Sequence, residues 1–359
     1  MQDWLIYGAN GYTGELAARE AVRRGLSPIL AGRNAGAVAL LARELDLPSR
    51  AFPLEDPAAV RAGLVGVGAV LHCAGPFVHT SPIMVNACLA TGAHYLDITG
   101  EMAVFEAILA PRKADAARRA GIALLPGVGF DVVPSDCLAA RLAAALPGAT
   151  ELTLAFASPA GAGSWSRGTA KTMIENLPHS GAIRKTGKII PVPLAYDARE
   201  IDFGGRLGKR WCVTIPWGDV STAYHSTGIP NIRVYTGMSS RRIRRLRRLR
   251  FLLPLTGLAA VKSFLKRRVD RTITGPGPEA RATGRTYLWG EVKDAAGATA
   301  TATLETPEAY AFTAVSAVAA TERVLAGGVP PGAWTPSRAF GPDFVTGLPG
   351  VVAGEVRRA

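Results

Sequence analysis

The chain has 359 residues, of which 48% are hydrophobic, 19% are charged and 7% are aromatic, and it contains 40 glycines. These proportions fit a globular protein and exclude collagen, a disulfide miniprotein and a chain disordered throughout. Because single hydrophobic cores stop growing near roughly 250 to 300 residues, the length favours two domains. The 4 cysteines show no CxxC spacing and the first residues show no basic region of a secretory signal, so we expect a cytoplasmic protein with reduced thiols.

The formal net charge of +13 belongs mainly to one segment of the chain. Twelve arginines and lysines and a single acid, Asp270, lie between Arg241 and Arg271. The rest of the chain is therefore nearly neutral. The net charge therefore indicates one positively charged surface region and does not indicate that the whole protein is basic.

In chain order, short apolar runs alternate with helix-length segments up to Gly148. Strands that alternate with helices in this way form a parallel sheet with right-handed crossovers. We therefore expect a doubly wound α/β domain of the nucleotide-binding type over residues 1–148. Its expected strands are residues 4–7, 28–31, 50–54, 69–73, 94–98 and 122–126.

Beyond Gly148 the pattern changes to longer strand-like runs separated by glycine and proline. This pattern predicts a second, α+β domain over residues 149–306, with a mixed and mainly antiparallel meander that faces the substrate. The basic segment interrupts it as an insert over residues 239–271. A helix then opens at Pro307, and we expect residues 307–359 to pack back on the first domain. The expected strands are residues 151–158, 187–196, 209–217, 231–237, 285–294 and 298–305.

A glycine-rich loop joins the first expected strand to the first helix. Its glycines have the spacing GxxGxxG, which lets a backbone approach a pyrophosphate at a helix N-terminus. The candidate cofactor-binding residues of this loop are Gly8, Asn10, Gly11, Tyr12, Thr13 and Gly14. The alternative is a plain strand-to-helix turn.

The end of the second strand favours NADP over NAD. NAD sites place an acid there for the ribose 2′-hydroxyl, whereas NADP sites place an arginine for the 2′-phosphate. Here Arg33 and Asn34 follow the strand, and the nearest downstream acid is Glu44, inside the next helix. We therefore expect Arg33 and Asn34 to bind NADP(H).

The loop, together with the motifs AVLHCAGPF, ACLATGAHYLDITGE and ALLPGVGFDVVPSD, resembles the saccharopine dehydrogenase-like oxidoreductases. Within that family it is most similar to the branch with mycobacterial trans-acting enoyl reductases and animal saccharopine dehydrogenase-like proteins. The resemblance runs over residues 4 to 140, and beyond 150 it rests on the strand pattern and the segment TPSRAFGPDF. It implies an oxidoreductase with an NADP-binding Rossmann domain, a mixed-sheet second domain and a returning C-terminal helix.

Ligands of open α/β sheets bind beyond the carboxyl ends of the strands, where the remaining candidates lie. The small residues Ala74, Gly75 and Pro76 would let the backbone border the ribose or nicotinamide. Hydride transfer also needs a proton donor, for which we name Asp131 and His79, with a bound water as the alternative. Tyr95, Asp97 and Glu101 are further candidates for this donor, but we favour a structural role for Asp97 as a buried, hydrogen-bonded acid.

Other reaction classes lack their motifs. The sequence has no HExxH, no zinc-ligand spacing and no P-loop, so we expect no metal. The glycine-rich segment 161–168 lacks the GxSxG of a serine hydrolase, and we interpret it as a loop over the substrate.

The basic insert contains an uncharged stretch, residues 251–261, that is too short to span a bilayer, which needs roughly 20 residues. It can lie on one, because arginines attract an anionic membrane surface and aliphatic side chains insert into it. We therefore expect peripheral attachment to the inner face of a membrane. The alternatives are an acidic acyl-carrier partner and, less favoured for lack of aromatic residues among the arginines, a nucleic acid.

These features together predict an NADP(H)-dependent reductase of an enoyl or other lipid-like acyl substrate at a membrane surface. Two alternatives remain. One is an imine or amino-acid oxidoreductase, for which Lys171, Arg184 and Lys185 could bind substrate carboxylates. The other is a non-catalytic, NADP-binding scaffold at the membrane.

Overall fold

The computed structural model describes residues 3–159, 165–176 and 181–359. The chain forms two compact units. Unit 1 comprises Met1–Val133 and Tyr310–Phe344, and unit 2 comprises Pro134–Ala309 and Val345–Ala359.

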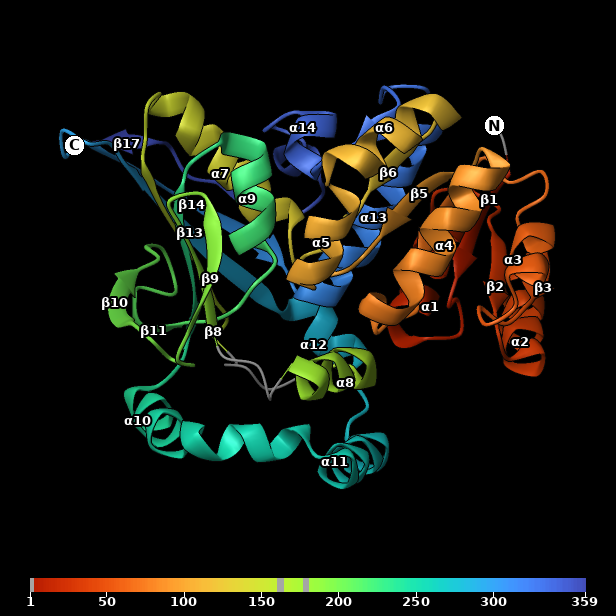
Figure 1. Ribbon diagram of the computed structural model, residues 1–359, viewed down its shortest axis with the longest axis horizontal. Helices are drawn as coiled ribbons and strands as arrows, with labels where there is room; N and C mark the ends of the chain where they lie inside the picture. The colour runs from red at the N-terminus through yellow and green to blue at the C-terminus, as the bar shows by residue number, and fades with distance from the viewer. Residues whose placement is uncertain (1–2, 160–164, 177–180) are drawn as a thin grey trace. The chain divides into compact units, whose positions relative to one another are not determined.

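Unit 1 contains a seven-stranded parallel sheet in the order β15-β6-β5-β4-β1-β2-β3 (Figure 1). The strands β1, β2, β4 and β6 are buried along their whole length, which is why they are apolar runs in the sequence. All six expected strands are present, and the predicted doubly wound parallel sheet is confirmed. The short strand β15 was not expected. The strands are β1 Trp4–Tyr7, β2 Ile29–Gly32, β3 Ser49–Ala51, β4 Ala69–His72, β5 His94–Asp97, β6 Ala123–Leu125 and β15 Gly332–Ala333.

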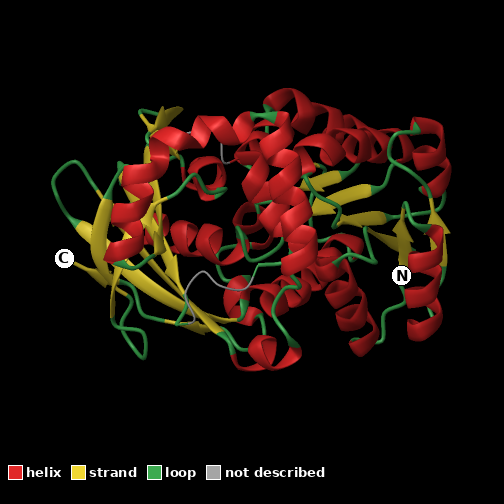
Figure 2. Ribbon diagram, turned by 90° about the horizontal axis from the view of Figure 1, so that it is seen from below, coloured by secondary structure: helices red, strands yellow, loops and turns green. Residues whose placement is uncertain are grey.

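Helices cover both faces of this sheet (Figure 2). Local caps fix where two of them begin: Asn34 accepts a hydrogen bond from Ala37 N, and Asp56 accepts from Ala58 N and Ala59 N. The helices are α1 Tyr12–Arg23, α2 Ala35–Leu45, α3 Pro57–Gly63, α4 Phe77–Thr91, α5 Met102–Ile108, α6 Pro111–Ala120, α13 Ala309–Leu325 and α14 Pro336–Phe340.

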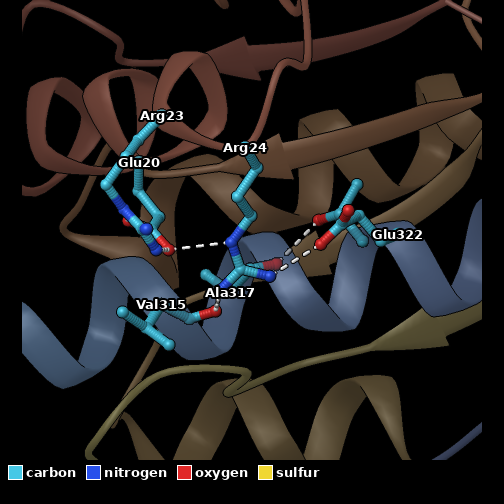
Figure 3. A network of polar contacts seen from close by, with 7 residues as sticks. Glu20, Arg23, Arg24, Val315, Ala317 and Glu322 are labelled. Carbon is cyan, nitrogen blue, oxygen red and sulfur yellow. Dashed lines mark hydrogen bonds and ion pairs between the residues drawn. The ribbon is translucent and has the colours of Figure 1, made fainter. Parts of the chain in front are cut away.

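Helix α13 is fastened to the end of α1, as Figure 3 shows. Arg24 donates to Glu322 of α13 at 2.7 Å, to the carbonyl of Val315 at 3.1 Å and to Glu20 of α1 at 2.7 Å. Burial alone would raise the pKa of Glu20, but the bonds from Arg23 and Arg24 bring it below its usual value. The helix starts at Ala309, because β14 continues as far as Pro307, where the sequence predicted the helix to open.

Unit 2 is built on a mixed sheet in the order β10-β11-β12-β7-β13-β14-β16. It is not a meander: β7 lies in the middle, parallel to β12 and antiparallel to β13. Four of its strands were not expected: β8, β10, and the short C-terminal strands β16 and β17. A tight turn at Thr186 and Gly187, both with positive φ, joins β8 to β9. The strands are β7 Glu151–Ala157, β8 Gly181–Lys185, β9 Lys188–Val192, β10 Ala198–Asp202, β11 Lys209–Thr214, β12 Asn231–Gly237, β13 Arg285–Lys293, β14 Thr299–Pro307, β16 Val352–Ala353 and β17 Arg357–Arg358.

The division into units differs from the expected boundaries at two places. Helix α7 belongs to unit 2 and not to the first domain, because Leu138 and Leu142 pack against Gly290 of β13. The C-terminal tail after Phe344 also belongs to unit 2, because β16 and β17 pair with β14. The helices of unit 2 are α7 Val133–Ala145, α8 Arg167–Asn176, α9 Asp219–Thr227, α10 Ser240–Leu249, η1 Arg250–Gly257, α11 Ala259–Thr272, α12 Pro278–Thr283 and η2 Val345–Gly347. Within the described ranges, no helix is long and apolar enough to cross a membrane.

Candidate cofactor and catalytic site

The loop between β1 and α1 is held against the neighbouring strand β2. Gly8 N and Ala9 N both donate to the carbonyl of Ala31, at 2.7 and 3.0 Å, and Gly11 N donates to Gly8 O at 2.9 Å. Helix α1 begins at Tyr12, and no side chain caps its first turn. The loop therefore presents the N-terminus of a long helix at the carboxyl end of β1, which is the place for a pyrophosphate.

Two of the three loop glycines are required by the geometry. Gly8 has φ 83, and a Cβ atom there would lie 2.9 Å from the Cβ of Ala74. A Cβ at Gly14 would lie only 2.2 Å from the carbonyl oxygen of Gly8. Gly11 has extended backbone angles that any residue adopts and meets only Gly8 O, at 3.1 Å. Gly8 and Gly14 therefore let α1 approach the strand ends closely.

Other candidates of the loop lie around these glycines. Asn10 is exposed, with Oδ1 3.1 Å from the position of a Cβ at Gly32. Tyr12 stacks edge-on against Tyr310, which directly follows the first residue of α13, with 5.0 Å between the ring centroids. Thr13 lies half-buried in the first turn of α1.

Arg33 follows β2 and is exposed. Among the described residues it has no hydrogen-bond or ion-pair partner, although its charge acts on the Tyr7 hydroxyl. Burial raises the pKa of Tyr7 to about 12, with Glu55 adding to the rise and Arg33 opposing it. Asn34 uses its side chain to cap α2. The only acid of α2, Glu44, pairs instead with Arg19, so it does not neutralise Arg33.

The turn after β4 is fixed by its own hydrogen bonds. The Thr80 hydroxyl donates to Ala74 O at 2.7 Å and lies 3.0 Å from His72 Nε2. Burial lowers the pKa of His72 to about 3, so this ring is neutral and structural. Gly75 and Pro76 then lead into α4.

Glu101 has a role that the sequence did not reveal. Its carboxylate accepts hydrogen bonds from Phe77 N at 2.7 Å and Val78 N at 2.9 Å, the first two residues of α4. A negative charge at a helix N-terminus is stabilising, and hydrogen bonds to a charged acceptor are strong. Glu101 thus holds the 74–76 turn and α4 in place.

We expect Glu101→Gln to lower the free energy of unfolding by about 1 to 2 kcal/mol, because the neutral amide keeps the shape but loses the charge-assisted bonds. Chemical denaturation would measure the change. Glu55→Gln, at an exposed acid of the same unit, is the matched control and should alter stability by less than about 0.5 kcal/mol. Equal stability of the Glu101→Gln variant and the wild type would contradict this role.

Asp97 is fully buried at the end of β5 and accepts three hydrogen bonds. They come from Tyr95 Oη at 2.7 Å, Thr99 N at 3.0 Å and Gly127 N at 2.8 Å. Burial raises its pKa to about 6, and the hydrogen bonds limit the rise. These contacts confirm the interpretation of Asp97 as a buried, hydrogen-bonded acid.

Asp131 lies where the carboxyl ends of β5 and β6 meet. Its Oδ2 is 2.8 Å from the position of a Cβ at Gly100, so the absence of a side chain at Gly100 makes room for the carboxyl group. Burial raises its pKa to about 7. A carboxyl group with this pKa exchanges protons readily near neutral pH.

Helix α13 braces the loop that carries Asp131. The Thr313 hydroxyl accepts from Phe130 N at 3.0 Å, and the Ser316 hydroxyl donates to Val128 O at 2.7 Å. Phe312 also contacts Phe130 edge-on. No local motif could have revealed these contacts, because about 185 residues separate the partners.

The other candidate donor, His79, is exposed in the first turn of α4. The structure therefore brings Asp131, Gly100 and Asp97 to one edge of the sheet, through the shared ends of β5 and β6. Among residues 3–159, 165–176 and 181–359, the side chain of His79 has no comparable set of contacts.

The basic candidates in unit 2 do not form a carboxylate-binding set. Lys171 pairs with Asp270 at 2.6 Å. Arg184 is buried, donates to the carbonyls of Val220 and Gly187 and lies over the Tyr224 ring. Lys185 is exposed at the end of β8. Part of the glycine-rich segment 161–168, residues 161–164, lies outside the described residues.

Comparison with known proteins agrees with this architecture. Residues 4–125 match the family model of the saccharopine dehydrogenase NADP binding domain. A saccharopine dehydrogenase (L-Glu forming) from Saccharomyces cerevisiae, solved in its apo form, superposes with a TM-score of 0.66 at 14% identity over 100% of both chains. This likeness shows the fold of both units.

Curated relatives match the chain in part. A mitochondrial saccharopine dehydrogenase-like oxidoreductase of Arabidopsis thaliana is 32% identical over 37% of this chain and 33% of the relative. A Mycobacterium tuberculosis protein assigned by name to the trans-acting enoyl reductases is 31% identical over 49% of this chain and 44% of its own length. The human saccharopine dehydrogenase-like oxidoreductase is 26% identical over 58% of this chain and 53% of the relative. The matches thus span about half or less of each relative. Over residues 4–125 the chain is therefore similar to the NADP binding domain of saccharopine dehydrogenases.

Proposed function

We propose that the protein is an NADP(H)-dependent oxidoreductase that reduces an enoyl or other lipid-like acyl substrate at a membrane surface. The catalytic part of this proposal is supported by the position of the Asp131 carboxyl group. It lies against Gly100 at the carboxyl edge of the nucleotide-binding sheet, and burial raises its pKa to about 7. This is the edge at which ligands of such sheets bind.

The residues present fit NADP(H). A side chain at Gly14 would collide with the loop backbone, so the glycine keeps the helix N-terminus close to the place of the pyrophosphate. The exposed Arg33 is available for the 2′-phosphate, and Asn10, Tyr12 and Thr13 border the loop. The turn at 74–76, held by Thr80 and Glu101, would lie along the ribose and nicotinamide.

Replacing Arg33 by alanine should weaken NADPH binding by about 10- to 100-fold and leave NADH binding within about twofold. An arginine–phosphate pair contributes a strong charge-assisted bond that NADH cannot make. Fluorescence titration of both nucleotides would measure the two affinities. Arg43→Ala, at an exposed arginine of the neighbouring helix α2, is the matched control. Equal weakening of NADH and NADPH would contradict a contact to the 2′-phosphate.

When bound, reduced NADP supplies the hydride for one carbon of the substrate double bond. The other carbon then needs a proton, and we assign its donation to the protonated Asp131. The carboxylate left behind regains its proton from water. The sum is addition of H⁻ and H⁺ across the double bond, with NADPH oxidised to NADP⁺ and the substrate reduced.

The choice of an acyl substrate has two supports. One is the printed name of the mycobacterial relative, which refers to enoyl reduction. The other is the exposed apolar and basic surface described below, which suits a substrate that partitions into membranes. An imine or amino-acid substrate is the alternative, but Lys171 and Arg184 are engaged in other contacts and do not favour it.

The test is NADPH oxidation by the purified protein in mild detergent, followed at the nicotinamide absorbance. The panel contains enoyl thioesters, ketoacyl thioesters, unsaturated lipids and cyclic imines. Turnover with an acyl substrate supports the proposal, and turnover with imines alone selects the alternative. Tight NADPH binding without turnover on any substrate, including a carrier-bound acyl chain, would favour a non-catalytic scaffold instead.

A further inference from the structure

The segment Ser240–Thr272, formed by α10, η1 and α11, is fixed to unit 2 at both ends; we call it the α10–α11 segment (Figure 1). At its start, Ile243 is buried against Ala195 and Val213, and Leu246 packs beside it. Arg247 donates to the carbonyl of Ala195 at 2.9 Å. The face of α10 that carries Ile243, Leu246 and Arg247 therefore packs against the rest of unit 2.

The end of the segment is fixed on α8. Val269 of α11 is buried against Ala170 and Ile174. Glu175 pairs with both Lys262 and Lys266, and these bonds lower its pKa to about 2. Three of the twelve basic residues of the segment, Arg247, Lys262 and Lys266, thus hold it to the unit and are not available to a partner.

The opposite face of α10 is a row of arginines. They recur at helical spacing and line one groove together with Leu249: Arg241, Arg244, Arg245 and Arg248. All four are exposed, and none makes a hydrogen bond or ion pair with a residue in the described part of the chain. Four uncompensated cations on one helix face form a strong site for anions.

Large apolar side chains are exposed directly after this row. Phe251 is 72% exposed, Leu255 56%, Leu258 58% and Phe264 57%. Exposing them to water is unfavourable, and a cluster of such residues marks an interaction surface. An ordered segment that is fixed at both ends keeps this apolar stretch at the surface, where it cannot fold into the core.

We propose that the α10–α11 segment is a docking element for an anionic lipid bilayer. The arginine row contacts lipid phosphates, while Phe251, Leu255, Leu258 and Phe264 insert among the acyl chains. Charge complementarity selects an anionic partner, and the apolar residues select a bilayer, because a nucleic acid offers them no apolar phase. The proposed function places the protein at a membrane surface, and the present inference rests on that placement. It adds that the partner is an anionic lipid bilayer.

Flotation with vesicles tests the electrostatic part at physiological salt. The full chain should bind vesicles containing anionic phosphatidylglycerol at least about tenfold more tightly than vesicles of phosphatidylcholine alone. Arg244→Glu/Arg248→Glu should weaken this binding by about 30-fold or more, because each arginine near the surface accounts for about fivefold. Arg112→Glu/Arg119→Glu on α6 changes the net charge equally at two exposed arginines and should have less than about a threefold effect.

The contribution of the exposed apolar side chains to membrane binding is tested with separate variants. Phe251→Ala/Leu255→Ala should weaken binding to anionic vesicles by about tenfold or more, since the truncated side chains bury less apolar area. The control Leu40→Ala/Val65→Ala removes side chains that are 70% and 68% exposed in unit 1 and should leave binding unchanged.

The proposal is overturned if anionic and neutral vesicles bind equally. It is also overturned if the apolar variant binds vesicles like the wild type while polyglutamate or RNA competes fully, which would identify an acidic protein or a nucleic acid as the partner. Vesicle binding is measured without NADPH oxidation, so failure here is distinguishable from failure of the proposed reaction.

Discussion

Gly14→Ala should abolish measurable NADPH binding, with an affinity at least about 100-fold below that of the wild type. The new Cβ would lie 2.2 Å from Gly8 O and 2.9 Å from Ala9 Cα, and both are backbone atoms that no side-chain rotation can move. Helix α1 must then shift away from the strand ends, so its N-terminus leaves the pyrophosphate position. Such overpacking also lowers the free energy of unfolding, by about 1 to 3 kcal/mol.

Fluorescence titration with NADPH and thermal unfolding would measure the two effects. Gly36→Ala is the matched control, because it is also in the first turn of a helix that follows a strand, and its Cβ would meet only Asn34 Oδ1 at 3.7 Å. That variant should bind NADPH normally and gain up to about 1 kcal/mol from the better helix propensity of alanine. A Gly14→Ala protein that folds and binds NADPH like the wild type would remove the structural basis for placing the cofactor here.

The parallel sheet of unit 1 could be predicted because its signals are local. The buried strands β1, β2 and β6 are uninterrupted apolar runs, such as Trp4–Tyr7, and each is followed by a helix-length segment. The glycine loop and Arg33 stand at fixed positions relative to those strands, so the candidate cofactor residues followed from the same pattern.

The contacts that hold the site depend on pairs that are distant in the sequence. Glu101 caps a helix that starts 24 residues earlier, and Ser316 bonds to a carbonyl 188 residues away. Helix α7 likewise follows the Rossmann strands in the chain but packs on Gly290 of unit 2. Sequence periodicity shows that a helix has an apolar face and does not show which surface covers it.

The basic insert is a case in which the structure refined the prediction. Ile243, Leu246 and Leu249 recur every three residues, so their positions drift around the helix. The structure shows the consequence: Ile243 is buried, Leu246 is half-buried and Leu249 is exposed beside the arginine row. The sequence could not show that Lys262 and Lys266 pair with Glu175, because that acid lies in the separate helix α8.

Asp131→Asn should reduce substrate-dependent NADPH oxidation by about 100-fold or more while NADPH affinity stays within about twofold. The amide has a similar shape but cannot donate the proton, and general acid catalysis contributes about 10²- to 10⁴-fold. Because the donor must be protonated and burial raises the pKa of Asp131 to about 7, wild-type turnover should fall as the pH rises above 7. His79→Gln discriminates between the two candidates: loss of turnover in that variant, with turnover retained in Asp131→Asn, would transfer the role to His79.

Asp131→Asn should also change the free energy of unfolding in a pH-dependent way, which can be measured without a substrate. The folded pKa of Asp131, about 7, lies above the ordinary 3.8, so the folded protein holds the proton more tightly, and wild-type stability declines as the pH rises between these values. The neutral amide of the variant carries no such penalty, and Asp131→Asn should therefore be more stable than the wild type at pH 8. Because the residue as a whole is partly exposed, although burial raises the pKa of its carboxyl group, we expect a difference of only about 1 to 2 kcal/mol. Denaturation at pH 5 and pH 8 measures the difference, with the exposed Asp3→Asn as control. A pH-independent difference between Asp131→Asn and the wild type would show that this carboxyl group is ionised at neutral pH, and it could then not serve as the proton donor.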